Sequence, residues 1–177
     1  MMTIGELSAQ NSPFAKKKPL PSTRGKATVK ELGKEIFDAM QSGRTDRLLV
    51  YLPSDKELKE LSKHERTHEK TKELVESLNA QQLEESFSLD LITVQNQLNA
   101  DAFSPALATM GPVTGARPKI PGVVPVTLTL MDSQQRPVNV TFEALRIEKR
   151  LFLLRNLQVQ KDMTAVNVEK APAKANP

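Results

Sequence analysis

The sequence contains no cysteine, no tryptophan and only one tyrosine among its 177 residues. The lack of cysteine excludes disulfide bridges, thiolate metal sites and cysteine nucleophiles. Because aromatic residues make up only 4% of the chain, leucine and valine have to supply most of the buried apolar surface. No apolar run approaches the roughly 18 residues that a membrane-spanning helix needs, so the sequence predicts no transmembrane segment.

The excess of positive charge is confined to the N-terminal part of the chain. Residues 1–26 contain five basic residues and one acidic residue, whereas the remaining residues contain 20 of each. A folded part without net charge argues against a broad phosphate-binding face, so no nucleic-acid partner is expected.

Composition also divides the chain into one domain and two tails. Residues 1–26 and 164–177 are rich in proline, lysine and alanine and show no apolar periodicity, which predicts disordered tails, the first of them basic. The part between them, 27–163, has the length of a single domain. Leu7-Ser8-Ala9-Gln10 resembles the end of a signal peptide, although the apolar segment that should precede it is missing. We therefore expect a periplasmic or secreted protein, with a cytoplasmic location as the alternative.

Helical signals fill the first half of the domain. Thr28 and Glu31 form a capping box, and apolar residues then recur at helical spacing to Met40. Ser54 begins a helix rich in lysine and glutamate that is predicted to extend to about Leu78. A further helix is predicted over residues 80–98.

After residue 101 the apolar period changes from that of a helix to that of a strand. Strands are predicted at 106–113, 124–130, 138–147 and 151–159. Leu145 falls on the opposite parity from Phe142, which predicts a bulge near Ala144. The predicted fold class is α+β, with N-terminal helices packed on a curved C-terminal antiparallel sheet of three to four strands. Its core is expected to contain Leu128, Phe142, Leu153 and Leu157 of the sheet, with Ile36 and Phe87 of the helices.

One motif is typical of catalysis. His64, Glu65 and His68 match the H-E-x-x-H pattern, in which two histidines on one helix face bind zinc and the glutamate acts as general base. Three basic residues, Lys63, Arg66 and Lys70, surround the motif and disfavour a dication there. We interpret the two histidines as half-exposed packing residues of the predicted helix, and a zinc hydrolase is kept only as a remote alternative. No catalytic, cofactor-binding or metal-binding residue is assigned.

The order of elements resembles the nuclear-transport-factor-like (cystatin-like cone) superfamily. Within it, two segments resemble a group of uncharacterised exported bacterial proteins: residues 37–43 (Phe-Asp-Ala-Met-Gln-Ser-Gly) leading to Leu52-Pro53-Ser54, and the hairpin from Ala144 to Val159. Residues 149–153 read Lys-Arg-Leu-Phe-Leu, where that group usually has Gly-Lys-Trp-Tyr-Leu. The resemblance implies helices packed on a strongly curved sheet with a pocket between them, and it implies no reaction.

These observations favour a non-enzymatic binding or interaction module of the bacterial envelope. Its partner is expected to be a small apolar ligand or a protein, bound on the concave sheet face, and a homodimer is possible. The alternative is a small cone-fold enzyme that uses a pocket carboxylate such as Asp90 or Glu143. No cofactor is predicted.

Overall fold

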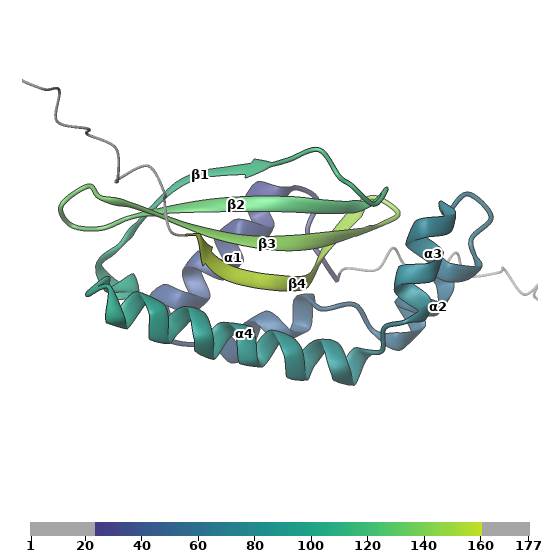
Figure 1. The fold of residues 1–177 in the computed structure, drawn as a ribbon, viewed down its shortest axis with the longest axis horizontal. Coiled ribbons are helices and arrows are strands. Elements are labelled where there is room, and N and C mark those ends of the chain that lie inside the picture. Colours follow the sequence, from purple (N-terminus) through teal and green to yellow (C-terminus); the bar gives the residue numbers. More distant parts are fainter. Residues whose placement is uncertain (1–23, 161–177) are drawn as a thin grey trace, which may run out of the picture.

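The computed structural model describes residues 24–160, in which helices precede a four-stranded antiparallel sheet (Figure 1). The strands pair in the order β1-β2-β3-β4. This arrangement confirms the predicted α+β fold. The bounds are α1 (Val29–Ser42), α2 (Asp55–Lys63), α3 (Glu69–Glu76), α4 (Ala80–Ala100), β1 (Thr109–Gly115), β2 (Val123–Met131), β3 (Pro137–Ile147) and β4 (Arg150–Gln160), with 3₁₀ helices at Thr45–Tyr51 and Pro105–Leu107.

The helices begin where side chains can satisfy their free N–H groups. Thr28 and Glu31 form the predicted capping box at the start of α1, and Ser54 forms a second one with Glu57 at α2. Asn79 accepts from the backbone N–H of Gln82 at the start of α4. These short-range contacts place three of the helix starts independently of the rest of the fold.

The prediction of one helix from Ser54 to about Leu78 is wrong. Helix α2 ends at Lys63 and α3 begins at Glu69, where the side chain of His68 accepts from the backbone N–H of Lys70. The break lets the two short helices pack against each other, so that Leu58 and Val75 lie in one hydrophobic cluster. A single straight helix would have kept these residues more than four turns apart.

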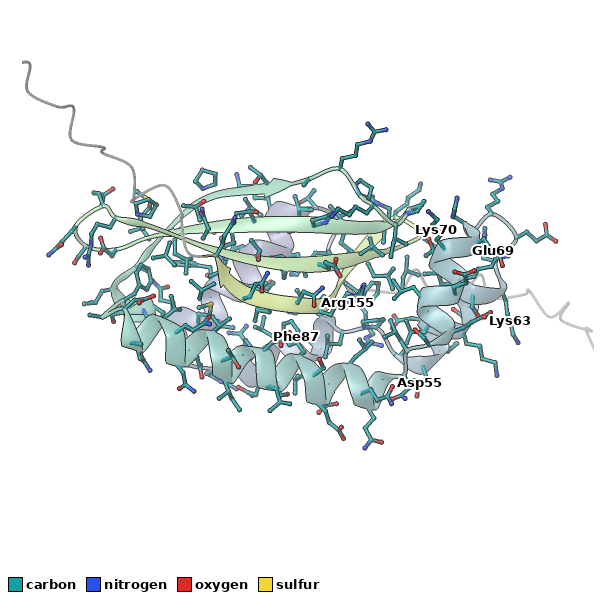
Figure 2. All side chains as sticks on the ribbon, in the orientation of Figure 1. Asp55, Lys63, Glu69, Lys70, Phe87 and Arg155 are labelled. Atoms are coloured by element: carbon teal, nitrogen blue, oxygen red, sulfur yellow. The ribbon has the colours of Figure 1, made fainter. Side chains whose placement is uncertain are left out.

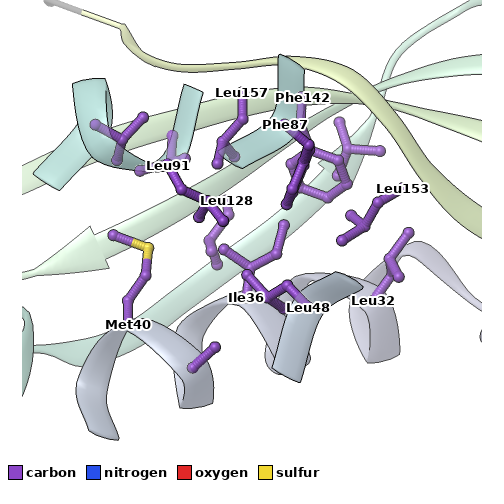
Figure 3. Packing of buried hydrophobic residues seen from close by; sticks show 14 of the residues in the cluster. Leu32, Ile36, Met40, Leu48, Phe87, Leu91, Leu128, Phe142, Leu153 and Leu157 are labelled. Atoms are coloured by element: carbon purple, nitrogen blue, oxygen red, sulfur yellow. The ribbon is translucent and has the colours of Figure 1, made fainter. Parts of the chain in front are cut away.

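The main hydrophobic core lies between one face of the sheet, called here the inner face, and helices α1 and α4 (Figure 3). The predicted core residues are all in this cluster and at most 2% exposed, which confirms the prediction: Ile36, Phe87, Leu128, Phe142, Leu153 and Leu157. Figure 1 shows α1 behind the sheet and α4 running alongside β4.

The predicted bulge near Ala144 does not belong to β3. Pairing of β2 with β3 runs without a shift from Val123↔Leu145 to Met131↔Pro137, so Leu145 and Phe142 point to opposite faces of a regular strand. The irregularities lie in the pairing of β3 with β4, and the extra residues are on β4. Leu145 packs against Leu58 of α2 and Val75 of α3 in a second hydrophobic cluster, which accounts for an apolar residue at this outward position. The cluster consists of Leu58, Val75, Leu83, Val123, Leu145 and Leu154.

The folded domain begins before the boundary expected at residue 27. Lys26 forms an antiparallel bridge with Leu151 at the edge of β4. Arg24 donates hydrogen bonds of 2.8 Å to the Glu57 carboxylate and to the carbonyl oxygen of Leu52. Residues 24–26, called here the N-terminal strap, are therefore part of the folded domain. The predicted boundary between a disordered tail and the domain, after residue 26, is wrong. The other residues of both predicted tails, 1–23 and 161–177, lie outside the described residues.

Gly25 allows the strap to lie this close to the sheet. Its φ is +76°, a conformation that favours glycine. A Cβ at this position would lie 2.9 Å from the carbonyl oxygen of Leu151 and 3.1 Å from the ring of Phe152. The strap thereby helps to bury Phe152, which is 2% exposed.

Candidate functional site

The inner face of the sheet is filled by the helices. Leu128, Leu153 and the α4 residue Val94 are all 0% exposed and belong to one packed cluster. An apolar ligand on this face would have to displace core side chains, at a cost comparable with the stability of the domain. Candidate sites therefore have to be sought on other surfaces.

The opposite face of the sheet, called here the outer face, carries a row of polar side chains. Thr114 is paired with Thr127, Thr127 with Thr141, and Thr141 with Gln158. Directly opposed residues on neighbouring strands point to the same face, so the row presents three hydroxyls and one amide across all four strands. These groups can both donate and accept hydrogen bonds.

A shallow hollow of about 300 Å³ lies on this face, at the centre of the row. We call it the sheet hollow. Its lining residues are Pro125, Val126, Thr127, Thr141, Phe142, Glu143, Asn156 and Gln158. The side chains of Val126 and Phe142 are buried on the inner face. The remaining lining side chains are those of Pro125 and of five polar residues, whose aliphatic parts leave the hollow with both polar and apolar surface.

Glu143 is the charged residue of the sheet hollow. Its Oε2 accepts from Arg155 Nε at 2.7 Å and from Asn156 Nδ2 at 3.1 Å. Its Oε1 has no hydrogen-bond partner within residues 24–160, and its side chain is 26% exposed. The Arg155 guanidinium thus compensates the charge of Glu143 while one carboxylate oxygen stays available as an acceptor. Figure 2 shows Arg155 on β4, near the middle of the sheet.

The irregular pairing of β4 brings both partners to Glu143. Between Gln158 and Leu153, β4 contains two more residues than the paired segment of β3. Asn156 adopts a φ of +59° there, which asparagine tolerates better than most residues. The sequence named Glu143 as a candidate, but its partners were missed because alternation patterns do not reveal which strand of a pair carries a bulge.

Asp90, the second candidate carboxylate, has a different environment. It lies on α4, and its Oδ2 accepts from the backbone N–H of Leu157 at 3.2 Å. Burial raises the pKa of Asp90 above its ordinary value, and the N–H groups of Leu157 and Asn156 lower it by less. Asp90 therefore ties α4 to the irregular part of β4, whereas Glu143 points to the outer face. The structure does not bring the two carboxylates into one site.

The H-E-x-x-H motif does not form a zinc site of the expected kind. His64 and His68 are exposed residues at the two ends of the turn between α2 and α3, so they do not share a helix face. Each Nδ1 accepts a backbone N–H at 3.2 Å, from Arg66 and Lys70 respectively. Within residues 24–160 no group of three or more acidic or histidine side chains is placed to hold a metal ion. The interpretation of the histidines as helix packing residues is also wrong.

A second hollow, of about 290 Å³, lies between α2 and α3. Its lining includes Asp55, Leu58 and Val75. Asp55 accepts from the backbone N–H of Ala80 at 2.7 Å, so its carboxylate holds the start of α4. Four polar residues line this hollow, one fewer than line the sheet hollow, and one of the four is used to hold α4, so this hollow is the weaker candidate.

In the part of the chain that the structure describes, no helix combines the length and apolar character needed to cross a bilayer. Glu143, Arg155 and Asn156, together with the threonine row, form the best-defined polar site among these residues. Comparisons with protein-family models, with curated proteins and with solved structures found no significant match.

Proposed function

We propose that this protein is a non-enzymatic binding module whose ligand contacts the sheet hollow. The observation that carries the proposal is the ion-paired Glu143, set among the hydroxyls of Thr127 and Thr141 with one carboxylate oxygen available. The ligand is a neutral, hydroxyl-rich molecule such as an oligosaccharide.

The charge and the size of the hollow support this class of ligand. Because Arg155 compensates Glu143, neither an anion nor a cation is strongly attracted, while hydroxyl groups can pair with carboxylate, amide and threonine side chains alike. A volume of about 300 Å³ is at the lower limit of ligand pockets. It suits one unit of a longer chain that continues along the polar row.

This proposal changes the expected ligand from apolar to polar, because the apolar face of the sheet is packed against α1 and α4. A small enzyme with a pocket carboxylate is the alternative function. Glu143 is the only one of the two candidate carboxylates that lines the sheet hollow. A carboxylate already paired with a guanidinium and an amide is better suited to accept hydrogen bonds than to transfer protons.

The superfamily resemblance and the envelope location are also proposals. Helices followed by a curved four-stranded meander support the resemblance to the cystatin-like cone. Cell fractionation of the full-length gene product tests the periplasmic or secreted location. If a homodimer forms, pairing through the free edge of β1 is disfavoured, since Pro112 and a register shift interrupt that strand.

Titration of the ¹⁵N-labelled protein with a panel of neutral oligosaccharides tests the proposed site. We expect chemical-shift changes at Thr127, Thr141 and Gln158, and about tenfold weaker binding for Glu143→Gln, since a hydrogen bond to a charged group contributes about 1.5–3 kcal/mol. Glu65→Gln removes the same charge from an exposed turn and should leave the affinity unchanged. Shifts confined to other surfaces, or turnover of a bound sugar, would refute a non-enzymatic module at this hollow.

A further inference from the structure

The near-neutral charge of the folded part hides an uneven distribution. No lysine or arginine occurs between Lys72 and Arg117, and α4, which lies within this stretch, carries only acidic charges. Basic side chains gather instead on three segments: the α2–α3 turn, the β1–β2 loop and the end of β3 with its turn into β4. We take two exposed basic residues from each segment: Arg66 in the turn with Lys70 at the start of α3, Arg117 with Lys119, and Arg146 with Lys149. Lys63, the last residue of α2, is a further exposed basic residue beside the same turn.

The tertiary contacts bring these three segments to one end of the molecule. Thr71 Oγ1 donates to the carbonyl oxygen of Pro121 at 2.5 Å, which joins the start of α3 to the β1–β2 loop. The backbone N–H of Arg146 donates to the carbonyl oxygen of Gly122 at 2.7 Å, which joins the end of β3 to the same loop. Figure 1 shows α3 beside the ends of the strands, and Figure 2 shows Lys70 there. We call the six residues the basic end.

The side chains of the basic end are not used by the fold. All six are exposed, and none forms an ion pair or a side-chain hydrogen bond within residues 24–160. The same segments hold only three carboxylates, Glu65, Glu69 and Glu148. Elsewhere in residues 24–160 seven basic residues form ion pairs, for example Arg24 with Glu57 and Arg155 with Glu143, whereas Lys30, Arg47, Lys59, Lys63 and Lys72 form none. Unpaired cations on three adjoining segments attract an anionic partner.

We infer that the basic end binds the anionic headgroups of a phospholipid surface. The six residues are exposed and line neither of the two hollows described above, so their charges are accessible to an extended and adaptable partner. The three segments, residues 64–70, 116–122 and 146–149, contain no phenylalanine, tyrosine or tryptophan on which a nucleic-acid base could stack. Among residues 24–160 the large exposed apolar residues are Val50, Leu89, Ile92 and Leu107, which lie in other segments. Binding therefore depends on charge alone, and salt reverses it.

This inference does not depend on the proposed ligand of the sheet hollow, because the hollow and the basic end share no residue. The strength expected is modest, because each basic residue near an anionic leaflet contributes about fivefold in affinity. A covalently attached acyl chain, or an apolar side chain inserted into the bilayer, would raise the affinity further. The six residues of the basic end provide neither.

Vesicle co-sedimentation tests the inference with the full chain. We expect binding to vesicles of 40% phosphatidylglycerol in phosphatidylcholine at low salt, no binding to pure phosphatidylcholine, and release at about 0.5 M NaCl. The double variant Arg117→Glu/Lys119→Glu should lower the affinity about 25-fold or more. Arg44→Glu/Arg47→Glu changes the net charge equally at another surface and should bind nearly as the unchanged protein does.

Three results would overturn the inference. They are failure to bind the anionic vesicles at low salt, an equal loss of affinity in the two double variants, and tighter binding to duplex DNA or single-stranded RNA than to the vesicles under the same conditions. Thermal unfolding of each variant shows whether it is folded. The charge reversals leave the sheet hollow intact, so oligosaccharide binding by Arg117→Glu/Lys119→Glu separates this test from that of the proposed function.

Discussion

The two halves of the outer sheet face differ although they belong to the same strands. Near the middle of the sheet, the outward residues Thr127 and Thr141 are polar and line a hollow. Toward the end beside α2 and α3, the outward residues Val123 and Leu145 are apolar, at most 3% exposed, and packed in the second cluster. Along one strand, the change from polar to apolar outward residues therefore marks where another layer of the protein covers the sheet.

The outer face of the sheet therefore has no uniform polarity. The alternation rule fixes the direction of a side chain, whereas its polarity follows from what lies in that direction. Five predictions test these packing layers, from the largest expected effect to the smallest.

Phe142→Ala should destabilise the domain most. Truncating a fully buried phenylalanine typically costs about 3–5 kcal/mol, and Phe142 is 2% exposed between the sheet and the helices. Thr127→Ala on the open part of the outer face is the control and should change the free energy of unfolding by less than about 0.5 kcal/mol. Urea denaturation measures both. A larger effect of Thr127→Ala would mean that the two faces have been exchanged.

Leu145→Ala should cost about 2–3 kcal/mol, toward the lower part of the range for buried leucine. Its cluster is small and lies at the end of the sheet, so α2 and α3 can relax into the space. Hydrogen exchange should therefore show faster exchange in α2 and α3 and little change in α1. Uniform acceleration across the domain would show that the second cluster is not a separate unit.

Gly25→Ala tests the N-terminal strap. It should cost about 2 kcal/mol, because a positive φ is strained for alanine and the new methyl group would meet Leu151 and Phe152. Gly43→Ala is a matched control, since its φ is +69° but no atom lies within 4 Å of the added Cβ. The difference between the two melting temperatures isolates the contact with the sheet. Equal losses would show that the strap does not pack as described.

Asp90 variants test the polar tie between α4 and β4. Asp90→Ala removes the acceptor of the Leu157 N–H group and should cost about 1 kcal/mol at neutral pH. Asp90→Asn keeps an acceptor and should cost less. Urea denaturation at pH 7 ranks the two variants, and a smaller loss for Asp90→Ala would contradict this role of the carboxylate.

The pH dependence of Asp90 has a defined sign. Since the folded pKa of Asp90 is raised above 3.8, protonation of this carboxylate favours the folded state. That protonation-dependent part of the stability is fully present below about pH 4 and is lost as the pH rises through the folded value, whereas the ionised carboxylate still accepts the hydrogen bond from Leu157. The Asn variant lacks this titration. Its stability relative to that of the unchanged protein should therefore increase as the pH rises from 3.5 to 7, and a decrease would contradict the raised pKa.

Much of the fold could be read from short-range patterns. Thr28 with Glu31 placed one helix start and Ser54 a second, and the alternation through Leu128, Phe142 and Leu153 placed the inner face. The patterns failed where two explanations fit equally well. Leu145 on the outer parity could indicate either a bulge or a second covered surface, and only the pairing of β2 with β3 distinguished them.

The candidate site was predictable in one residue only. Glu143 was named from its position in a strand, but its partner Arg155 is 12 residues away and reaches it through an irregular strand pair. Net charge likewise concealed the basic end, because a sum over the chain carries no information about where the charges gather.

The sequence by itself determined the helix caps, the alternating strands and the composition of the core, since these depend on residues within a few positions of one another. The tertiary structure decided the break between α2 and α3, the docking of Arg24 on Glu57, and the joining of α3 to the β1–β2 loop through Thr71 and Pro121. The last two contacts link residues 33 and 50 positions apart. They form only because burial of the two clusters brings those segments together, which no local pattern in the chain encodes.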